Sequence, residues 1–279
     1  MPIHRVSENL LTTRCKGKYA VSPDGEIKLL SIQQFSEPRF KPSGWEDSRR
    51  DGAKKKIATP DDGSDIVMDE RERDVWADKM RAVRRAKIAC FDIIQCNPEL
   101  DVFATLTLSA DSVGDRGSWE NAYGAVRGWL SNRVQRRGLK YILVPEYHKD
   151  GKSIHFHAVM NRDSLALEKA RYPDSGRLMY HKGQQVYNVA DFTGGFTTAK
   201  IIGGENATDK VSKYIFKYMG KQMGTKIGGR YYLHGGDLRA PLCRYADEPA
   251  ELLLPDAVPT HTKTVDVTDK LTYKEWYFV

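Results

Sequence analysis

Two histidines and two tyrosines in this chain of 279 residues stand at spacings that suit phosphodiester chemistry. His155 and His157 flank Phe156, and side chains two apart on a β-strand point to the same face, so both imidazoles can bind one divalent metal. Tyr214 and Tyr218 are four apart, so their phenols fall on one side of a helix. A metal that neutralises a phosphate and a phenol that attacks it are what cleavage of a nucleic-acid strand requires.

A third metal ligand follows from the pairing of two predicted strands. Residues 141–148 and 153–160 have the composition of strands and are joined around Asp150-Gly151, a pair that favours a tight type I′ turn. Counting outward from that turn places Glu146 opposite His155, on the same face as both imidazoles, with opposed Cβ atoms about 5 Å apart. The three side chains predict a site for Mg²⁺ or Mn²⁺ with open positions for phosphate oxygens.

Two lysines share the predicted helix face of the tyrosines. Residues 208–222 have helical periodicity, and Lys217 and Lys221 follow Tyr214 and Tyr218 by three residues each, while an apolar stripe falls on the other side. Free tyrosine has a pKa of about 10, so a tyrosine nucleophile needs a nearby positive charge or a base. We therefore assign the two tyrosines as nucleophiles and the two lysines as groups that assist them.

These patterns also have simpler interpretations. A lone His-x-His is more often a pair of partly exposed histidines than a metal site, and two tyrosines one turn apart are more often packing residues. The opposed Glu146 favours the metal site, and the separate apolar stripe favours a free tyrosine face. His148 would lie on the face of the site but is interpreted as a surface or structural residue. The same interpretation is given to His4, His181 and His234.

The charge of the chain favours a polyanionic partner. Lys and Arg number 44 against 37 Asp and Glu, a net charge of +7, which fits nucleic acid through counterion release and fits acidic lipids equally well. No run of 18 apolar residues and no apolar signal-peptide core is present, so we expect no membrane partner and a cytoplasmic location. The candidate contacts to a DNA backbone are Arg133, Arg136, Arg137 and Lys140.

The four cysteines form no Cys-x-x-Cys pair and are too sparse for a disulfide framework, so we expect reduced, structural thiols.

Around the motifs, the periodicity predicts a helix over 69–88, a strand over 103–108, a helix between a Ser118 cap and a Gly138 stop, and a strand over 192–202. Residues 161–188 resemble a loop. Outside these segments we expect a small β element over 1–35, a linker over 36–65 with a basic run at 49–56, a second linker over 246–264 and a short strand in 265–279.

Three segments in order, Phe103-Ala-Thr-Leu-Thr107, His155-Phe-His157 and Tyr214-x-x-Lys217-Tyr218-x-x-Lys221, resemble the three motifs of the HUH endonuclease superfamily. The two tyrosines are similar to those of the rolling-circle replication initiators of small single-stranded DNA phages and plasmids. The resemblance covers about residues 100 to 245. It implies an α+β fold with a central antiparallel sheet flanked by helices, metal histidines on a central strand and tyrosines on an adjacent helix.

The resemblance also implies a reaction and its partners. A tyrosine nicks one strand at an origin, leaving a 5′-phosphotyrosine and a free 3′-OH that primes replication, and the strands are later rejoined. By motif, His155 and His157 match the metal ligands, Tyr214 and Tyr218 the nucleophiles, and Lys217 the motif lysine. Single-stranded or hairpin origin DNA is the implied substrate. No phosphate-binding loop of an ATPase occurs, so a host helicase would unwind and a host polymerase would extend.

We therefore expect an N-terminal region over 1–98, an endonuclease domain over 99–225 and a C-terminal extension over 226–279. Two other functions stay open. One is a transposase or relaxase of the same superfamily, and the other is a non-catalytic DNA-binding protein with a structural metal site. The nick site, the metal used in the cell, the order of the tyrosines and the oligomeric state also stay open.

Overall fold

A computed structural model describes residues 11–38 except 24 and 26, and residues 70–204, 206–219, 221, 225–246, 259, 261–268 and 271–277. The chain divides into two compact units, one of residues 1–70 with 241–279 and one of residues 71–240, and each is described by itself. The domain boundaries drawn from the sequence stay a prediction. Among the described residues, no helix is both long and apolar enough to cross a membrane.

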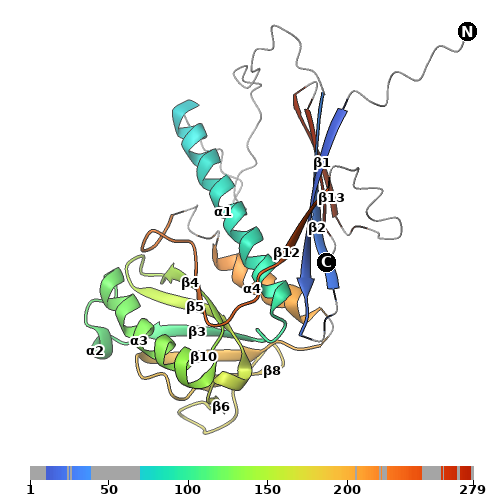
Figure 1. Ribbon diagram of the computed structural model, residues 1–279. Coiled ribbons are helices and arrows are strands. Elements are labelled where there is room, and N and C mark those ends of the chain that lie inside the picture. The colour runs from blue at the N-terminus through green and yellow to red at the C-terminus, as the bar shows by residue number, and fades with distance from the viewer. Residues whose placement is uncertain are drawn as a thin grey trace, which may run out of the picture. The chain divides into compact units, whose positions relative to one another are not determined.

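The first unit contains a five-stranded antiparallel sheet in the order β12-β1-β2-β14-β13 (Figure 1). Its strands are β1 (Leu11–Val21), β2 (Ile27–Pro38), β12 (Leu242–Ala246), β13 (His261–Thr268) and β14 (Leu271–Tyr277). The predicted N-terminal β element is confirmed as the β1–β2 hairpin, but the tail supplies two paired strands rather than one. Most of the predicted linker 36–65, including the basic run 49–56, and the segment 247–258 lie outside the described residues.

The second unit is built on a seven-stranded antiparallel sheet in the order β11-β4-β5-β3-β10-β9-β6. Its strands are β3 (Val102–Leu108), β4 (Tyr141–Tyr147), β5 (Ile154–Met160), β6 (Leu167–Lys169), β9 (Tyr187–Val189), β10 (Gly195–Ile201) and β11 (Leu233–Gly235). The helices are α1 (Glu70–Cys96), α2 (Ala110–Val113), α3 (Trp119–Arg137), α4 (Ala207–Met219) and the short 3-10 helix η2 (Arg162–Ser164). An antiparallel sheet flanked by helices confirms the expected α+β class, and β5 lies inside the sheet between β4 and β3.

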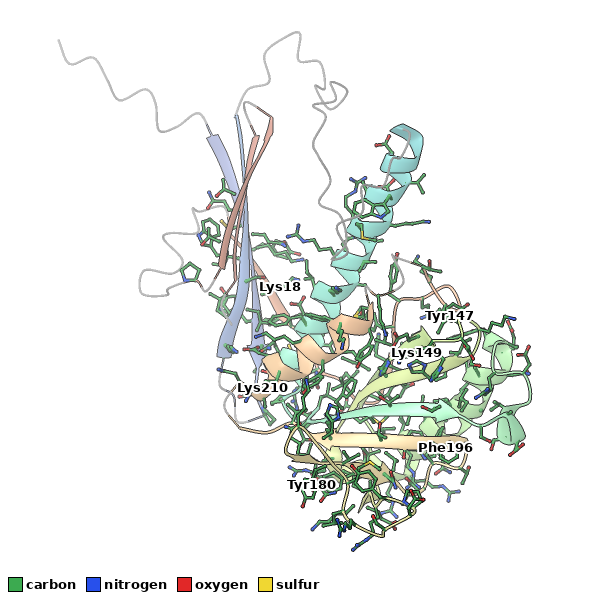
Figure 2. All side chains as sticks on the ribbon, turned by 180° about the vertical axis from the view of Figure 1, so that it is seen from behind. Lys18, Tyr147, Lys149, Tyr180, Phe196 and Lys210 are labelled. Atoms are coloured by element: carbon green, nitrogen blue, oxygen red, sulfur yellow. The ribbon has the colours of Figure 1, made fainter. Side chains whose placement is uncertain are left out.

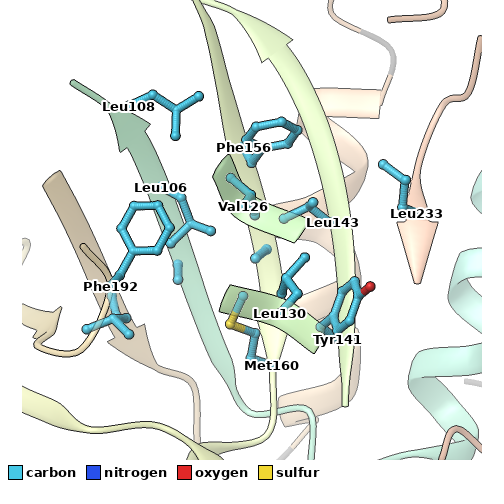
Figure 3. Close-up of a cluster of buried hydrophobic side chains, with 14 of the residues drawn as sticks. Leu106, Leu108, Val126, Leu130, Tyr141, Leu143, Phe156, Met160, Phe192 and Leu233 are labelled. Atoms are coloured by element: carbon cyan, nitrogen blue, oxygen red, sulfur yellow. The ribbon is translucent and has the colours of Figure 1, made fainter. Parts of the chain in front are cut away.

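One face of this sheet is covered by α3. Alternate β5 residues, including Phe156 and Met160, pack against Val126 and Leu130 of the helix, and all four are buried (Figure 3). The helix boundaries follow their caps, because the Ser118 side chain accepts a hydrogen bond from the Asn121 amide and Gly138 closes the C-terminus with a left-handed backbone. Both boundaries confirm the predicted helix.

The other face carries α1 and α4. Here Val159 of β5 joins Val211, Ile215 and Met219 of α4 in a second buried cluster, and Cys90 of α1 belongs to it as well. Because side chains alternate along β5, His155 and His157 point to this second face, together with Val159. The apolar stripe predicted for the tyrosine helix is therefore the side that packs on the sheet.

The helix α1 is longer than predicted and helps to position α4. The sequence predicted an end at residue 88, but the helix runs to Cys96 because Cys90 and Ile94 bury themselves in the second cluster. Its last turn contacts the start of α4, where Gln95 donates to Asp209 at 2.8 Å and accepts from the Thr208 hydroxyl at 3.2 Å. These bonds fix the N-terminal turn of the tyrosine helix.

The β4–β5 hairpin has the predicted register with a different turn. Glu146 faces His155 and Val144 faces His157, as expected. The predicted two-residue type I′ turn is wrong, because only Gly151 has a positive φ and the backbone bond from His148 to Ser153 closes a four-residue loop. The loop gains one residue on each side of Asp150-Gly151, so the register is unchanged.

The segment predicted as a loop, 161–188, contains short paired strands. In addition to β6 and β9 it contains a two-stranded hairpin of β7 (Tyr180–His181) and β8 (Gln184–Gln185). Lys182, in the turn between them, has a φ of 50°, which is rare for a residue with a side chain. We call residues 162–189 the insert.

Candidate active site

The three predicted metal ligands meet on the second face of the sheet. Nε2 of His157 lies 2.6 Å from Oε2 of Glu146, Nε2 of His155 lies 3.3 Å from the same oxygen, and the two nitrogens are 3.0 Å apart. One ligand atom from each residue lies within 4.8 Å of the others, and all three side chains are buried. We call Glu146, His155 and His157 the triad.

The protonation states of the triad suit a cation. Burial lowers the pKa of His157 to about 4, helped by the neighbouring His155, and burial also lowers the pKa of His155, so both imidazoles are neutral near pH 7. Burial alone would raise the pKa of Glu146, but hydrogen bonds from Lys221 and His157 outweigh it and lower that pKa. Two neutral imidazoles and one carboxylate are therefore available at neutral pH.

Two residues of β3 that the sequence left without a role support His157. Oγ1 of Thr105 lies 3.1 Å from Nδ1 of His157. When a metal takes the place of the Nε2 proton that contacts Glu146, the hydroxyl can accept a proton from Nδ1 and hold the ring in the tautomer whose Nε2 lone pair faces the metal. The ring of Phe103 stacks on the same imidazole at 5.8 Å. The signal for both was strand alternation within the first motif, because Phe103, Thr105 and Thr107 share a face of β3, and Thr105 pairs with His157 in the register.

These observations show that the triad fits a divalent metal. Its ligand atoms converge, its imidazoles are neutral, and one imidazole has a partner that orients it. Three protein ligands leave further coordination positions open, as catalytic metals need. The mixed nitrogen and oxygen set suits a divalent metal, and Mg²⁺ or Mn²⁺ as its identity stays a prediction.

Both predicted nucleophiles lie beside the triad, in different environments. The Tyr218 ring stacks on the His157 imidazole with centroids 3.5 Å apart and is half-buried. Tyr214 stacks on Phe103 at 5.3 Å, and the same phenylalanine contacts Tyr218 at 5.7 Å. Tyr214 is 36% exposed. One aromatic stack thus joins the two phenols to a candidate metal ligand, His157.

The two predicted lysines differ in their contacts. The ammonium groups of Lys217 and Lys221 each lie 5.7 Å from the Tyr218 ring centroid. Lys221 also forms an ion pair with Oε1 of Glu146, although its side chain is 56% exposed. Lys221 thus connects Tyr218 to the triad, whereas Lys217 contacts Tyr218 and forms no ion pair with the described residues.

The pKa of Tyr218 is raised, which is the opposite of what a free nucleophile needs. Burial is the largest cause, the Glu146 carboxylate adds to it, and the positive charge of Lys221 opposes it. Burial and the carboxylate together outweigh the charge of Lys221, and the assistance of the two lysines to the tyrosines stays a prediction. A cation bound at the triad would offset the Glu146 charge and favour the phenolate.

Cavities adjoin the tyrosines and the triad. One of about 460 Å³ runs from Thr105 past Tyr214, Lys217 and Tyr218 to the insert. A second of about 390 Å³ is lined by Glu146 and Lys221 together with His148 and Lys149. The first cavity therefore adjoins the two tyrosines, and the second adjoins the triad at Glu146. His148 contacts the His155 ring edge-on at 5.5 Å, so it borders the site rather than lying remote from it.

The predicted DNA-backbone contacts lie elsewhere. Arg133, Arg136 and Arg137 belong to α3, on the opposite face of the sheet from the triad. Arg133 pairs with Asp191, and Lys140 pairs with Glu99 at 2.8 Å. Arg136 and Arg137 are exposed. Contacts of these four residues with DNA stay a prediction.

Comparison with known proteins gives one finding. The family model described as replication-associated protein ORF2/G2P matches residues 101–223, which contain the triad, both tyrosines and both lysines. No curated protein and no solved structure matches the chain. The match supports a role for this chain in the initiation of replication.

Proposed function

We propose that this protein is a two-tyrosine, metal-dependent endonuclease that nicks one strand at a replication origin and later rejoins it. A phosphate bound at the triad would lie close to the Tyr218 ring. The observation that carries the proposal is the stack of Tyr218 on the metal-ligand candidate His157, at 3.5 Å. The family match over residues 101–223 supports replication as the setting.

The proposed reaction is an in-line displacement at phosphorus. The phenolic oxygen forms a bond to the phosphate, the bond to the 3′ oxygen breaks, and the products are a 5′-phosphotyrosine and a free 3′-OH. The phenol loses its proton, and the leaving oxygen gains one. A metal held by the triad supplies neutralisation of the phosphate charge. Because the ester conserves the energy of the broken bond, attack by a 3′-OH rejoins the strand.

The chain's own residues have separate roles in this proposal. Glu146, His155 and His157 bind the metal, and Lys217 and Lys221 bring positive charge to the phenol of Tyr218. Tyr214 is available as a second nucleophile, so one tyrosine can hold a DNA end while the other cuts. A 3′-OH left by the nick serves a host polymerase, and a host helicase supplies unwinding.

A non-catalytic protein with a structural metal is the main alternative. Structural zinc sites use four protein ligands, whereas three converge here among the described residues, and cavities adjoin Glu146 and His155. Open positions beside a tyrosine favour catalysis. A transposase or relaxase would share this geometry, and it differs in its DNA substrate rather than in its triad.

An adduct assay tests the function. Labelled single-stranded DNA from the origin region is incubated with the protein and Mn²⁺, and a covalent product that survives a denaturing gel is expected. The double variant Tyr214→Phe, Tyr218→Phe keeps both rings and should form none. Lys213→Gln, an exposed lysine on the same helix, serves as the control. Undiminished adduct in the double variant would refute the nucleophile assignment.

A further inference from the structure

We infer that the cavity between α4 and the insert binds the single-stranded nucleotides that adjoin the scissile phosphate, by stacking on Tyr180 and Tyr172 and by phosphate contacts to Lys182 and Lys200. This inference rests on the proposed function and names the part of the chain that holds its substrate. The insert, which no motif covers, then acts as a DNA-binding element.

The position of the cavity connects it to the chemistry. Its lining begins at Phe103 and Thr105, which contact His157, and includes Tyr214 and Tyr218. From there it extends to the β7–β8 hairpin of the insert. A strand whose phosphate lies beside Tyr218 therefore has about 460 Å³ of adjoining space in which to continue.

The chemistry of the lining matches a nucleic-acid strand. Among the described residues that line it are three lysines and no acidic side chain. Lys182 comes from the hairpin turn, Lys200 from β10 and Lys217 from α4, so positive charge approaches from three elements. The described residues form no ion pair with any of the three. Unpaired cations on three walls favour an anion such as a phosphodiester.

Two of these lysines are close enough to affect each other. Burial lowers the pKa of Lys200, and the charge of Lys182 lowers it further. Like charges held together without a counterion raise the free energy of the unbound protein, and a bound phosphate would relieve that repulsion. The φ of 50° at Lys182 also places a lysine where the backbone favours glycine or asparagine.

Aromatic side chains complete the surface. Tyr172 is 45% exposed and Tyr180 is 53% exposed, although large aromatic rings are usually buried. Both come from the insert and line the cavity, and Tyr180 is labelled in Figure 2, away from Lys149, which lines the second cavity. Exposed rings beside lysines are the surface on which single-stranded bases stack.

The binding test measures DNA affinity in a protein that lacks both proposed nucleophiles. The double variant Tyr214→Phe, Tyr218→Phe serves as the background, with chelator present, and its affinity for a labelled oligo(dT) of about 12 nucleotides is measured by fluorescence anisotropy. Adding Lys182→Asn and Lys200→Gln should weaken binding about tenfold at low salt. The slope of log K against log salt should fall by about 1.4, or 0.7 for each lost phosphate contact. Asparagine is chosen because it tolerates the φ of residue 182.

Matched controls separate stacking from folding. Tyr180→Ala should weaken binding about tenfold and Tyr180→Phe should restore it, because the ring rather than the hydroxyl carries stacking. Lys169→Gln, exposed on β6 of the insert and outside the cavity, should change neither affinity nor slope. Equal affinity of the Lys182→Asn, Lys200→Gln protein and its background would overturn the inference.

Crosslinking locates the strand directly. An oligo(dT) containing one 5-iododeoxyuridine is irradiated with the background protein, and crosslinked peptides are identified by mass spectrometry. Crosslinks at Tyr172, Tyr180 or His181 are expected, and crosslinks confined to other segments would overturn the inference. The binding and adduct assays together distinguish failure of the cavity proposal from failure of the nuclease proposal. Wild-type adduct with unchanged binding in the cavity variants rejects only the cavity, whereas cavity-dependent binding without any adduct rejects only the nuclease.

Discussion

The ring of Tyr218 lies nearly parallel to the imidazole of His157, with centroids 3.5 Å apart and planes 19° apart. Tyr214 stacks instead on Phe103, and it lines the cavity toward the insert. The two phenols are therefore not equivalent with respect to the triad. A phosphate bound at the triad would be closer to Tyr218, which contacts His157, so we expect Tyr218 to be the nucleophile of the first cut.

Replacing one tyrosine at a time should reveal this difference. In a single-turnover adduct assay we expect Tyr218→Phe to slow the first cut about a hundredfold or more, because the nucleophile is lost while the ring stack remains. Tyr214→Phe should change that step less than about threefold. The order would be reversed if Tyr214→Phe alone abolished adduct while Tyr218→Phe retained it.

Thr105 should control metal affinity without binding metal itself. The Thr105→Val variant keeps the shape of the side chain but loses the hydrogen bond to Nδ1 of His157, so Mn²⁺ affinity should fall about tenfold or more. Mn²⁺ binding is measured from the paramagnetic resonance signal of the free ion. Thr107→Val is the matched control, since Thr107 faces His155 in the register and Nδ1 of that histidine has no partner among the described residues. Equal losses in both variants would contradict the role of Thr105.

Lys221 should compete with the metal for Glu146. The ammonium group pairs with Oε1 of Glu146 and adds positive charge beside the triad, so Lys221→Gln should tighten Mn²⁺ binding about fivefold. The same variant should slow adduct formation, because the cation near Tyr218 is lost. Lys213→Gln should affect neither quantity. Weaker Mn²⁺ binding in Lys221→Gln would show that the lysine supports the site rather than competing for it.

The stability of the metal-free protein should fall as the pH is lowered from about 6.5 to about 4. In that window His157 binds a proton in the unfolded protein but not in the folded protein, because burial lowers the folded pKa of His157 to about 4. The free energy of unfolding therefore rises with pH there, by up to about 3 kcal/mol for this group. Urea denaturation across the range measures the change. His157→Asn, which cannot titrate, should have a shallower pH dependence, and an equal slope would contradict the assignment.

The register of the hairpin that carries the triad was predicted correctly although its loop was not, because the loop has one extra residue on each side of the predicted turn. The loop that forms is two residues longer than the predicted turn, yet Glu146 still faces His155, since one residue was added on each side. The buried face of α4 was predictable as well, because its apolar residues recur at helical spacing on one side of the helix. Both features depend on local periodicity, which a single sequence contains.

The support around the triad depends on contacts that periodicity does not encode. The role of Thr105 requires the β3–β5 register, and the length of α1 requires a cluster formed with strands far along the chain. The raised pKa of Tyr218 depends on how deeply the ring is buried and on the position of Glu146. The insert was missed because its strands are only two or three residues long.

Because α3 closes one face of the large sheet, all of the proposed chemistry is confined to the other. The protein can therefore be immobilised or labelled through α3. A surface anchor or a bulky fluorophore attached to an exposed α3 position such as Arg136 would leave the triad side of this unit open, so single molecules could be tested for the proposed cutting and resealing of a strand.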